Sequence, residues 1–318
     1  MITRSSLERG NREHELIATV ALIRSPSRSV GVERLASLID QTGSAVELVQ
    51  LDLEDVLFSA PEVDLRIAGT ITDELVGAAA VDVLDWQGRG IDSRSVLDPH
   101  YPANLRAVFD RPPLVFVRGS LRALEDRASI AVVGTRKATA EGVARAARLA
   151  RELVEAGFTV TSGLAAGIDT AAHSAALDAD GRTLAVMGTG LDHVYPATNR
   201  GLAARIVASG CALVTQFFPH QTPRQWTFPA RNVVMSGLSL ATVVVEASET
   251  SGARLQARVA LQHGRAVFML KSLVDHHAWA REFVEEGIDG SRAVVMASTA
   301  DIVERFDATR WEPLPVSA

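Results

Sequence analysis

The spacing of apolar residues divides the sequence into two parts. In the first part, from Glu15 to Leu57, apolar residues recur at helical spacing in three groups that short polar linkers separate. A further helical stretch runs from Ile71 to Gly90, and a segment with several prolines follows it. We therefore expect a small helical domain at residues 1–95 and a connector at residues 96–119.

The second part alternates short apolar runs with amphipathic segments. The expected strands are residues 129–134, 158–163, 183–190, 211–216, 241–247 and 265–270, and the expected helices are residues 139–156, 168–177, 199–209, 252–263 and 278–286. This alternation predicts an α/β domain at residues 120–300, built on a doubly wound, mostly parallel Rossmann-like sheet, and a tail at residues 301–318. Ligands of such a sheet bind at the carboxyl ends of its strands.

The composition excludes several classes of protein. Among 318 residues, 47% are hydrophobic, so the chain can bury a substantial core and is neither disordered nor fibrous. Its single cysteine, Cys211, cannot close an intramolecular disulfide, and no Cys/His cluster has the spacing of a zinc site. The N-terminus lacks the apolar core of a signal peptide, and no run of about 18 apolar residues occurs. We expect a cytoplasmic protein with no membrane contact, no metal and no cofactor.

The net charge restricts how the chain could bind nucleic acid. A net charge of −6 argues against a protein that coats nucleic acid by bulk attraction, because such affinity depends on many phosphate contacts. Residues 120–240 contain 12 Lys and Arg against 9 Asp and Glu, so this segment carries +3 and the rest of the chain −9. The middle of the chain is therefore where we expect an anion site.

Two predicted strands end in glycine-containing loops. The first loop is Gly134–Thr139 and the second is Thr161–Asp169; both connect a strand to a helix, where backbone amides can bind phosphate. Neither loop has the GxGxxG or Walker fingerprint, so glycines that only form tight turns remain an alternative. Arg136 and Lys137 favour an anion site, since cations in a ligand crevice need a negative partner.

Seven motifs then occur in order: DPHYPANLR with DRPPLVFVRG, IAVVGTR, VTSGLAAGIDTAAH, GTGLDHVYPATN, FPARN, SGLS and VVVEASETSG. In order and spacing they resemble the DprA/Smf family of DNA-processing proteins over about residues 98–270. The N-terminal helices are similar to that family's small helical (SAM-like) domain. The resemblance implies a homodimer that binds single-stranded DNA, protects incoming DNA and helps to load a RecA-like recombinase in natural transformation and recombination.

The resemblance also implies roles for individual residues. Arg136 and Arg231 would face the DNA backbone, and the loops at Ser162, Gly163 and Asn199 would line the pocket. Arginine suits this role because its planar fork pairs with phosphate and stacks on bases; a structural salt bridge is the alternative for Arg231. The full set that we assign to nucleic-acid binding is Arg136, Lys137, Ser162, Gly163, Asn199, Arg231 and Asn232, with Gly134, Gly167, Asp169 and Glu246 at the edge of the ligand site.

The chain departs from the family pattern at several positions. Val233 stands where the family usually has a second arginine after FPxRN, which removes a cation. The segments Thr215–Pro219 and Phe268–Lys271 also differ, and SGARLQA at residues 251–257 replaces the family's SGSLxTA. Arg254 in that segment could supply the missing charge. The departures indicate a divergent member whose DNA affinity or ligand has shifted.

An enzyme is the less favoured interpretation, and we expect no catalytic residues. Asp169 and His173 share one helix face, but we expect Asp169 to cap a helix or order a loop and His173 to pack against the sheet. Glu246 ends an apolar strand at the ligand edge, where the lysine-decarboxylase-like class places a glutamate, but the PGGxGT loop of that class is absent. The alternative is a nucleotide-derivative sensor or hydrolase that uses the same pocket. An NAD-dependent oxidoreductase is disfavoured by the loop sequence around Arg136.

Overall fold

The computed structural model describes residues 2–25, 31–51 and 70–306. The chain forms two compact units. The first unit contains residues 1–101 and 109–116, and the second contains residues 102–108 and 117–318. No helix in the described ranges is long and apolar enough to cross a membrane.

The first unit is mainly helical. It contains η1 (Arg4–Ser6), α1 (Arg12–Arg24), α2 (Val32–Thr42), α3 (Ala45–Gln50), α5 (Asp73–Gly88) and β1 (Asp92–Ser95). Asn11, Ser44 and Thr72 cap the starts of α1, α3 and α5 by accepting backbone N–H groups. The buried carboxylate of Glu15 accepts from the amides of Ala45 and Val46 at 2.6 and 3.1 Å, which fastens α1 to the start of α3. The predicted helices are confirmed here, whereas residues 52–57 of the first predicted stretch lie outside the described residues.

The second unit is a parallel sheet between helices. Its strands are β3 (Ser129–Gly134), β4 (Thr159–Ser162), β5 (Thr183–Val186), β6 (Ala212–Thr215), β7 (Ala241–Glu246), β8 (Ala266–Leu270) and β9 (Ala293–Met296), and β2 (Leu114–Gly119) enters this unit at Val117. The helices are α6 (Ala103–Arg106), η2 (Glu125–Arg127), α7 (Ala140–Glu155), α8 (Ile168–Asp178), η3 (Ala197–Asn199), α9 (Arg200–Ala208), α10 (Thr227–Leu238), α11 (Gly252–Gln262), α12 (Lys271–His276), α13 (Ala278–Glu285) and α14 (Ala300–Phe306).

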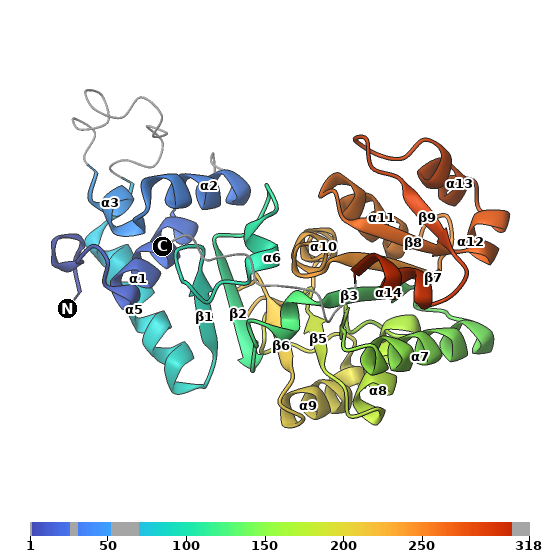
Figure 1. The fold of residues 1–318 in the computed structure, drawn as a ribbon. Coiled ribbons are helices and arrows are strands. Elements are labelled where there is room, and N and C mark those ends of the chain that lie inside the picture. The colour runs from blue at the N-terminus through green and yellow to red at the C-terminus, as the bar shows by residue number, and fades with distance from the viewer. Residues whose placement is uncertain (1, 26–30, 52–69, 307–318) are drawn as a thin grey trace. The chain divides into compact units, whose positions relative to one another are not determined.

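The strand order determines where a ligand can bind. The seven strands β3 to β9 pair in parallel in the order β6-β5-β4-β3-β7-β8-β9. From β3 the chain runs outward through β4, β5 and β6, then returns to add β7, β8 and β9 on the other side of β3. Helices α7, α8 and α9 cover one face of the sheet, and α10 and α11 cover the other (Figure 1). The predicted doubly wound fold is confirmed, and its switch point lies between β3 and β7, where a crevice is expected.

Several elements were not expected from the sequence. Helix α10 contains Pro229, but proline in the first turn of a helix costs no hydrogen bond, so the helix forms around it. Strand β9 is short, and both of its central valines are exposed, so the apolar alternation of a strand is missing. The segment expected as a connector contains α6 and β2, and the first residues of the expected tail form α14.

Candidate functional site

The loops after β3 and β4 meet at the switch point because three glycines allow close approach. Gly167 has φ +80°, and a β-carbon there would lie 2.4 Å from the carbonyl oxygen of Thr135 in the other loop. A β-carbon at Gly134 would lie 2.4 Å from the Ile168 side chain and 2.8 Å from the Glu246 carbonyl oxygen. Gly163 leaves room for a side chain from α10, described below. Glycine at these positions therefore does more than form tight turns.

Asp169 organises the loop after β4. It lies in the first turn of α8, and its Oδ2 accepts from the amides of Gly163 and Ala165 at 3.1 and 3.3 Å. The side chain is buried, and burial raises the pKa of its carboxyl group, while the charge of Arg231 and the hydrogen bonds from this loop lower it. As expected, Asp169 orders a loop.

Arg231 forms the floor of the site. It projects from α10, and a β-carbon at Gly163 would lie 1.5 Å from its Nη1, so the guanidinium occupies the space that glycine leaves free. Nη1 donates to the carbonyl oxygen of Val186 at 3.1 Å, and Nε has no hydrogen-bond partner. Among the described residues Arg231 forms no salt bridge, which was the structural alternative for it. Burial lowers the pKa of its guanidinium; the charge of Asp169 raises that pKa and the charge of Arg136 lowers it.

Arg136 and Lys137 form the rim of the site. Both side chains are exposed in the loop after β3. The Arg136 guanidinium lies 5.2 Å from the centre of the Phe228 ring, a cation–π distance, and within the described parts of the chain it has no ion pair. The rim therefore presents two exposed cations that contribute little to holding the fold together.

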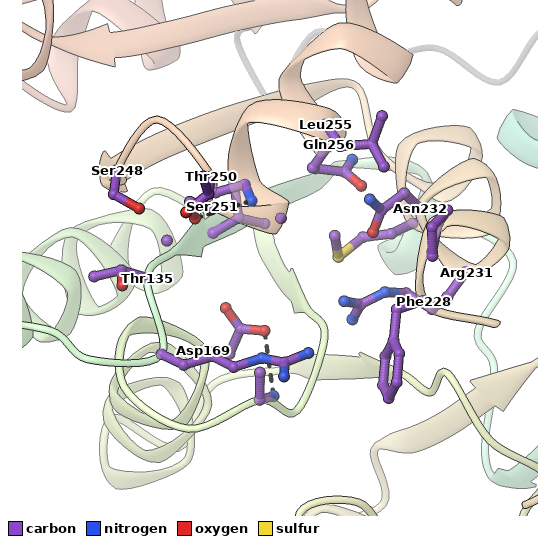
Figure 2. A pocket seen from close by; sticks show the side chains of 18 of the residues that line it. Thr135, Asp169, Phe228, Arg231, Asn232, Ser248, Thr250, Ser251, Leu255 and Gln256 are labelled. Carbon is purple, nitrogen blue, oxygen red and sulfur yellow. Dashed lines mark hydrogen bonds between the residues drawn. The ribbon is translucent and has the colours of Figure 1, made fainter. Parts of the chain in front are cut away.

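These elements enclose a pocket of about 410 Å³ at the ends of β3 and β7. Its lining includes six of the residues expected from the sequence: Gly134, Arg136, Lys137, Asp169, Arg231 and Asn232. Figure 2 shows Arg231, Asn232 and Phe228 on one side of the pocket and Ser248, Thr250 and Ser251 on the other. The second group belongs to the loop after β7 and the start of α11.

Five expected site residues do not line the pocket, and four of them are Ser162, Gly163, Gly167 and Asn199. The hydroxyl of Ser162 is fully buried and donates to the Val132 carbonyl oxygen at 2.7 Å. The Asn199 amide donates to the Leu164 carbonyl oxygen and the Thr170 hydroxyl, both at 2.9 Å. Gly163 and Gly167 act through the space they leave for neighbouring groups. The Ser162 hydroxyl thus bonds to the neighbouring strand β3, and the Asn199 amide supports the loop after β4.

Glu246 also lies outside the lining and holds the start of α7. Its carboxylate accepts from the Thr139 amide at 3.2 Å and from the Thr139 hydroxyl at 2.8 Å. Negative charge at the amino end of a helix is favourable, so this contact is structural. Arg254 likewise stays outside the lining, because its guanidinium lies 3.7 Å from the Glu249 carboxylate.

His173 is enclosed by the sheet. Its side chain is fully buried, and Nδ1 lies 2.7 Å from the hydroxyl oxygen of Thr183. Burial, with the nearby charge of Arg231, lowers the pKa of its imidazole to about 3. Histidine in this position is neutral at physiological pH and, as expected, packs against the sheet.

The sequence did not indicate Gln256 as a pocket residue. Gln256 is 1% exposed on α11, its Nε2 lies 3.4 Å from the hydroxyl oxygen of Thr242, and its Oε1 has no partner. Its position after the serine and glycine that begin α11 was the available signal, since helix starts at strand ends often face ligands.

The comparisons with known proteins agree with this architecture. The family model "DNA recombination-mediator protein A" matches residues 93–307, which is more than half of the chain. The chain belongs to the DprA/Smf family. The DNA processing protein DprA of Bacillus subtilis is 37% identical over 194 residues, covering 61% of this chain and 65% of that protein. DprA of Streptococcus pneumoniae is 36% identical, covering 68% of this chain and 74% of that protein.

Solved structures of DprA share the fold. The DprA structure from Streptococcus pneumoniae has a TM-score of 0.68 and 28% identity, covering 96% of this chain and 100% of that one. The structure from Helicobacter pylori, described as giving insights into a single-stranded DNA binding mode, has a TM-score of 0.59 at 23% identity, covering 69% of this chain and 96% of that one. The matched regions span only 65% of the Bacillus subtilis relative and 45% of the Smf proteins of Synechocystis and Escherichia coli.

Proposed function

We propose that this chain binds single-stranded DNA in the pocket between β3 and β7. The observation that carries the proposal is the position of Arg231, which is buried at the switch point, has the charge of Asp169 nearby but forms no salt bridge with any described residue, and has Nε unpartnered. A buried cation is costly unless a negative group neutralises it, and a phosphate supplies that group. Arg136 and Lys137 at the rim would contact further phosphates, and Asn232 would contact the nucleotide beside Arg231.

The wider role follows from the family. We propose that the protein protects incoming single-stranded DNA and helps to load a RecA-like recombinase in natural transformation and recombination. In this role it would act in the cytoplasm as a homodimer and without catalysis. Relatives named as DNA processing proteins and the Helicobacter pylori structure described with single-stranded DNA support this proposal.

Fluorescence anisotropy of a labelled oligonucleotide at several salt concentrations tests the proposal. Arg136→Gln should weaken binding about tenfold, as expected for one charge-assisted phosphate contact, and should make the slope of log K against log salt less negative by about 1. Arg205→Gln is the matched control, since Arg205 is an exposed arginine on α9 paired with Asp178, away from the pocket lining. Absence of oligonucleotide binding by the unmodified chain at low salt would refute the proposal.

A thermal-shift comparison separates DNA binding from a nucleotide sensor or hydrolase. Stabilisation by AMP, ADP-ribose or NAD, with none by an oligonucleotide, would favour the second function. The role of Glu246 in fastening α7 weighs against hydrolysis, because a catalytic carboxylate would have to release the Thr139 amide first.

A further inference from the structure

Two exposed aromatic side chains lie outside the pocket lining. Among the described residues of the second unit, the exposed aromatic side chains are Tyr195, with 44% of its surface exposed, and Trp226, with 58%. Tyr195 lies in the segment after β5 and Trp226 in the segment after β6. Both therefore lie at the carboxyl ends of the strands, the edge that carries the pocket.

A ring contact connects Tyr195 to the pocket residue Phe228, and Trp226 lies close to Phe228 in the sequence. The Tyr195 and Phe228 rings have centres 5.5 Å apart, and Phe228 lies beneath the Arg136 guanidinium at 5.2 Å. Trp226 directly precedes α10, two residues before Phe228, and its ring meets Phe217 edge-on with centres 5.5 Å apart. We call Tyr195, Trp226 and Phe228 the aromatic surface.

The backbone beneath the aromatic surface is fixed in place. Gly190 and Asp192, in the Tyr195 segment, donate to the carbonyl oxygens of Gln221 and Pro219 at 2.9 and 3.0 Å. A β-carbon at Gly190 would lie 2.0 Å from the Phe218 carbonyl oxygen, so only glycine allows this approach. The segment after β5 and the segment after β6 are therefore hydrogen-bonded to each other before a ligand arrives. A ligand would not have to order them on binding.

The charges around the aromatic surface favour a polyanion. Residues 216–226 contain Arg224 and no acidic residue. In the Tyr195 segment, Asp192 has the guanidinium of Arg118 3.8 Å away. Rings interleaved with cations at the mouth of a basic pocket are the arrangement that binds single strands, because the bases stack on rings while the phosphates contact cations. An apolar protein partner would not require these cations.

We propose that Trp226 and Tyr195 stack bases of a single-stranded nucleic acid, and so extend the binding site from the pocket across the ends of β5 and β6. This inference rests on the proposed function, because it assigns further nucleotides of the same strand to the aromatic surface. It also predicts that the contact is tolerant of base sequence, since every base has a stacking face.

Tryptophan fluorescence gives a direct test. The fluorescence is measured with Trp311→Phe in every sample, because Trp311 lies outside the described residues. Trp86 and Trp279 are 3% and 2% exposed, so in this background Trp226 should account for most of the quenching that an oligo(dT) causes. Trp226→Phe should abolish that quenching and keep the affinity within about twofold, because phenylalanine still stacks. Trp226→Ala should weaken binding about fivefold or more, the usual effect of losing one stacked base, and Tyr195→Ala should have a smaller effect.

Salt dependence and abasic DNA distinguish stacking from phosphate contacts. Trp226→Ala should leave the salt slope unchanged, whereas Arg136→Gln reduces it. An oligonucleotide without bases should bind the unmodified chain and Trp226→Ala equally. Leu124→Ala, at an exposed leucine that precedes β3 and so lies away from the carboxyl ends of the strands, is the control and should not change DNA affinity.

The outcomes separate this inference from the proposed function. If Arg136→Gln weakens binding but Trp226→Ala does not, and the quenching persists in Trp226→Phe, the aromatic surface is not part of the site while the pocket still is. If the unmodified chain binds no oligonucleotide, the proposed function itself fails. Unchanged thermal midpoints of Trp226→Phe and Trp226→Ala exclude loss of folding as the cause.

Discussion

Two arginines lie at opposite ends of β5 and have different environments: Arg182 is partly buried and Arg231 is buried. Arg182 directly precedes the strand, and its guanidinium donates to both carboxylate oxygens of Asp126, at 2.5 and 2.8 Å, and to the Gly210 and Ser120 carbonyl oxygens. Arg231 donates to the last residue of the strand, Val186, forms no salt bridge with a described residue, and leaves Nε unpartnered.

The pKa directions follow this difference. Burial lowers the pKa of Arg182, but the hydrogen bond and charge of Asp126 outweigh it, so that pKa is raised. At Arg231 burial is the largest effect, so the pKa is lowered. Arg182 therefore has a carboxylate partner in a salt bridge, whereas Arg231 has only the charge of Asp169 nearby and lines the pocket.

Exchanging each arginine for methionine should separate these two roles, and this is the largest effect that we expect. Arg182→Met leaves the Asp126 carboxylate with the Arg122 amide but without its arginine, and should lower the free energy of unfolding by about 3 kcal/mol, since several charge-assisted hydrogen bonds are lost. Arg231→Met removes a cation that forms no salt bridge with a described residue and takes its charge away from Asp169, so it should lower that free energy much less than Arg182→Met, while oligonucleotide binding is lost. Urea unfolding and anisotropy measure the two quantities. Equal destabilisation by both variants would show that Arg231 is structural.

His173, close to Arg231, should make stability depend on pH. Its pKa is about 3 in the folded chain against 6.5 for an ordinary histidine, so the unfolded chain takes up the proton first and stability falls as the pH falls from 6.5 toward 3. The stability difference between the unmodified chain and His173→Asn should change by about 2 kcal/mol between pH 7 and pH 5.

The comparison with His173→Asn is needed because Asp169 acts in the opposite direction. The pKa of Asp169 is raised, so its contribution to stability is present below 3.8 and is lost as the pH rises through its folded-state pKa. Both chains contain Asp169, so its effect cancels in the difference. A difference that stays constant between pH 7 and pH 5 would contradict a neutral, buried His173.

Gly163→Ala should weaken DNA binding and Gly134→Ala should lower stability, because the added β-carbon meets different neighbours at the two positions. The β-carbon at position 163 meets the end of the flexible Arg231 side chain, which can move out of the pocket floor. We expect about tenfold weaker oligonucleotide binding, which corresponds to about 1.4 kcal/mol, with little change in thermal midpoint.

At position 134 the β-carbon meets Ile168 and the Glu246 backbone, which cannot move as freely. Gly134→Ala should therefore lower the thermal midpoint through overpacking, a loss of about 1–3 kcal/mol. A large stability loss in Gly163→Ala, or none in Gly134→Ala, would reverse this assignment.

The sequence predicted the sheet well because its strands are nearly continuous apolar runs between amphipathic helices. The expected strand at residues 129–134 has the observed bounds of β3, and the expected helix at 168–177 differs from α8 by one residue. Helix α10 is not among the expected helices; it contains Pro229, which is a weak helix signal within the FPARN motif.

The site was only partly predictable, because polar residues at strand ends serve both ligands and loops. Arg136 and Lys137 are exposed with no ion pair in the described structure. Asn199 and Ser162 also come from motifs of the family, but their side chains donate hydrogen bonds to nearby backbone carbonyl oxygens. Which of these outcomes occurs depends on contacts across the sheet that sequence spacing does not encode. The contact between the Arg231 guanidinium and Gly163 is an example, because it forms only when α10 packs over β4 and β5.

Two glutamines give a second pair of side chains, one with its hydrogen bonds formed and one with an unpartnered oxygen. Their substitution is expected to have the smallest effect on stability and binding. Gln50, on α3 in the first unit, donates from Nε2 to the carbonyl oxygens of Arg4 and Leu7 at 2.9 and 3.0 Å. Gln256 lines the pocket, and its buried Oε1 has no partner. Gln50→Leu should lower the free energy of unfolding by about 1 kcal/mol, whereas Gln256→Leu should leave it unchanged or raise it.

For oligonucleotide binding, we expect the larger effect from the Gln256 variant. Gln256→Leu removes an amide that lies in the pocket beside Asn232 (Figure 2), so oligonucleotide affinity should fall a few fold, while Gln50→Leu should not change it. Urea unfolding and anisotropy on both variants check the pair. Gln256→Leu could instead destabilise the chain as much as Gln50→Leu and bind DNA normally. The unpartnered Oε1 of Gln256 would then not indicate a ligand contact, and the same inference from the unpartnered Nε of Arg231 would be weakened.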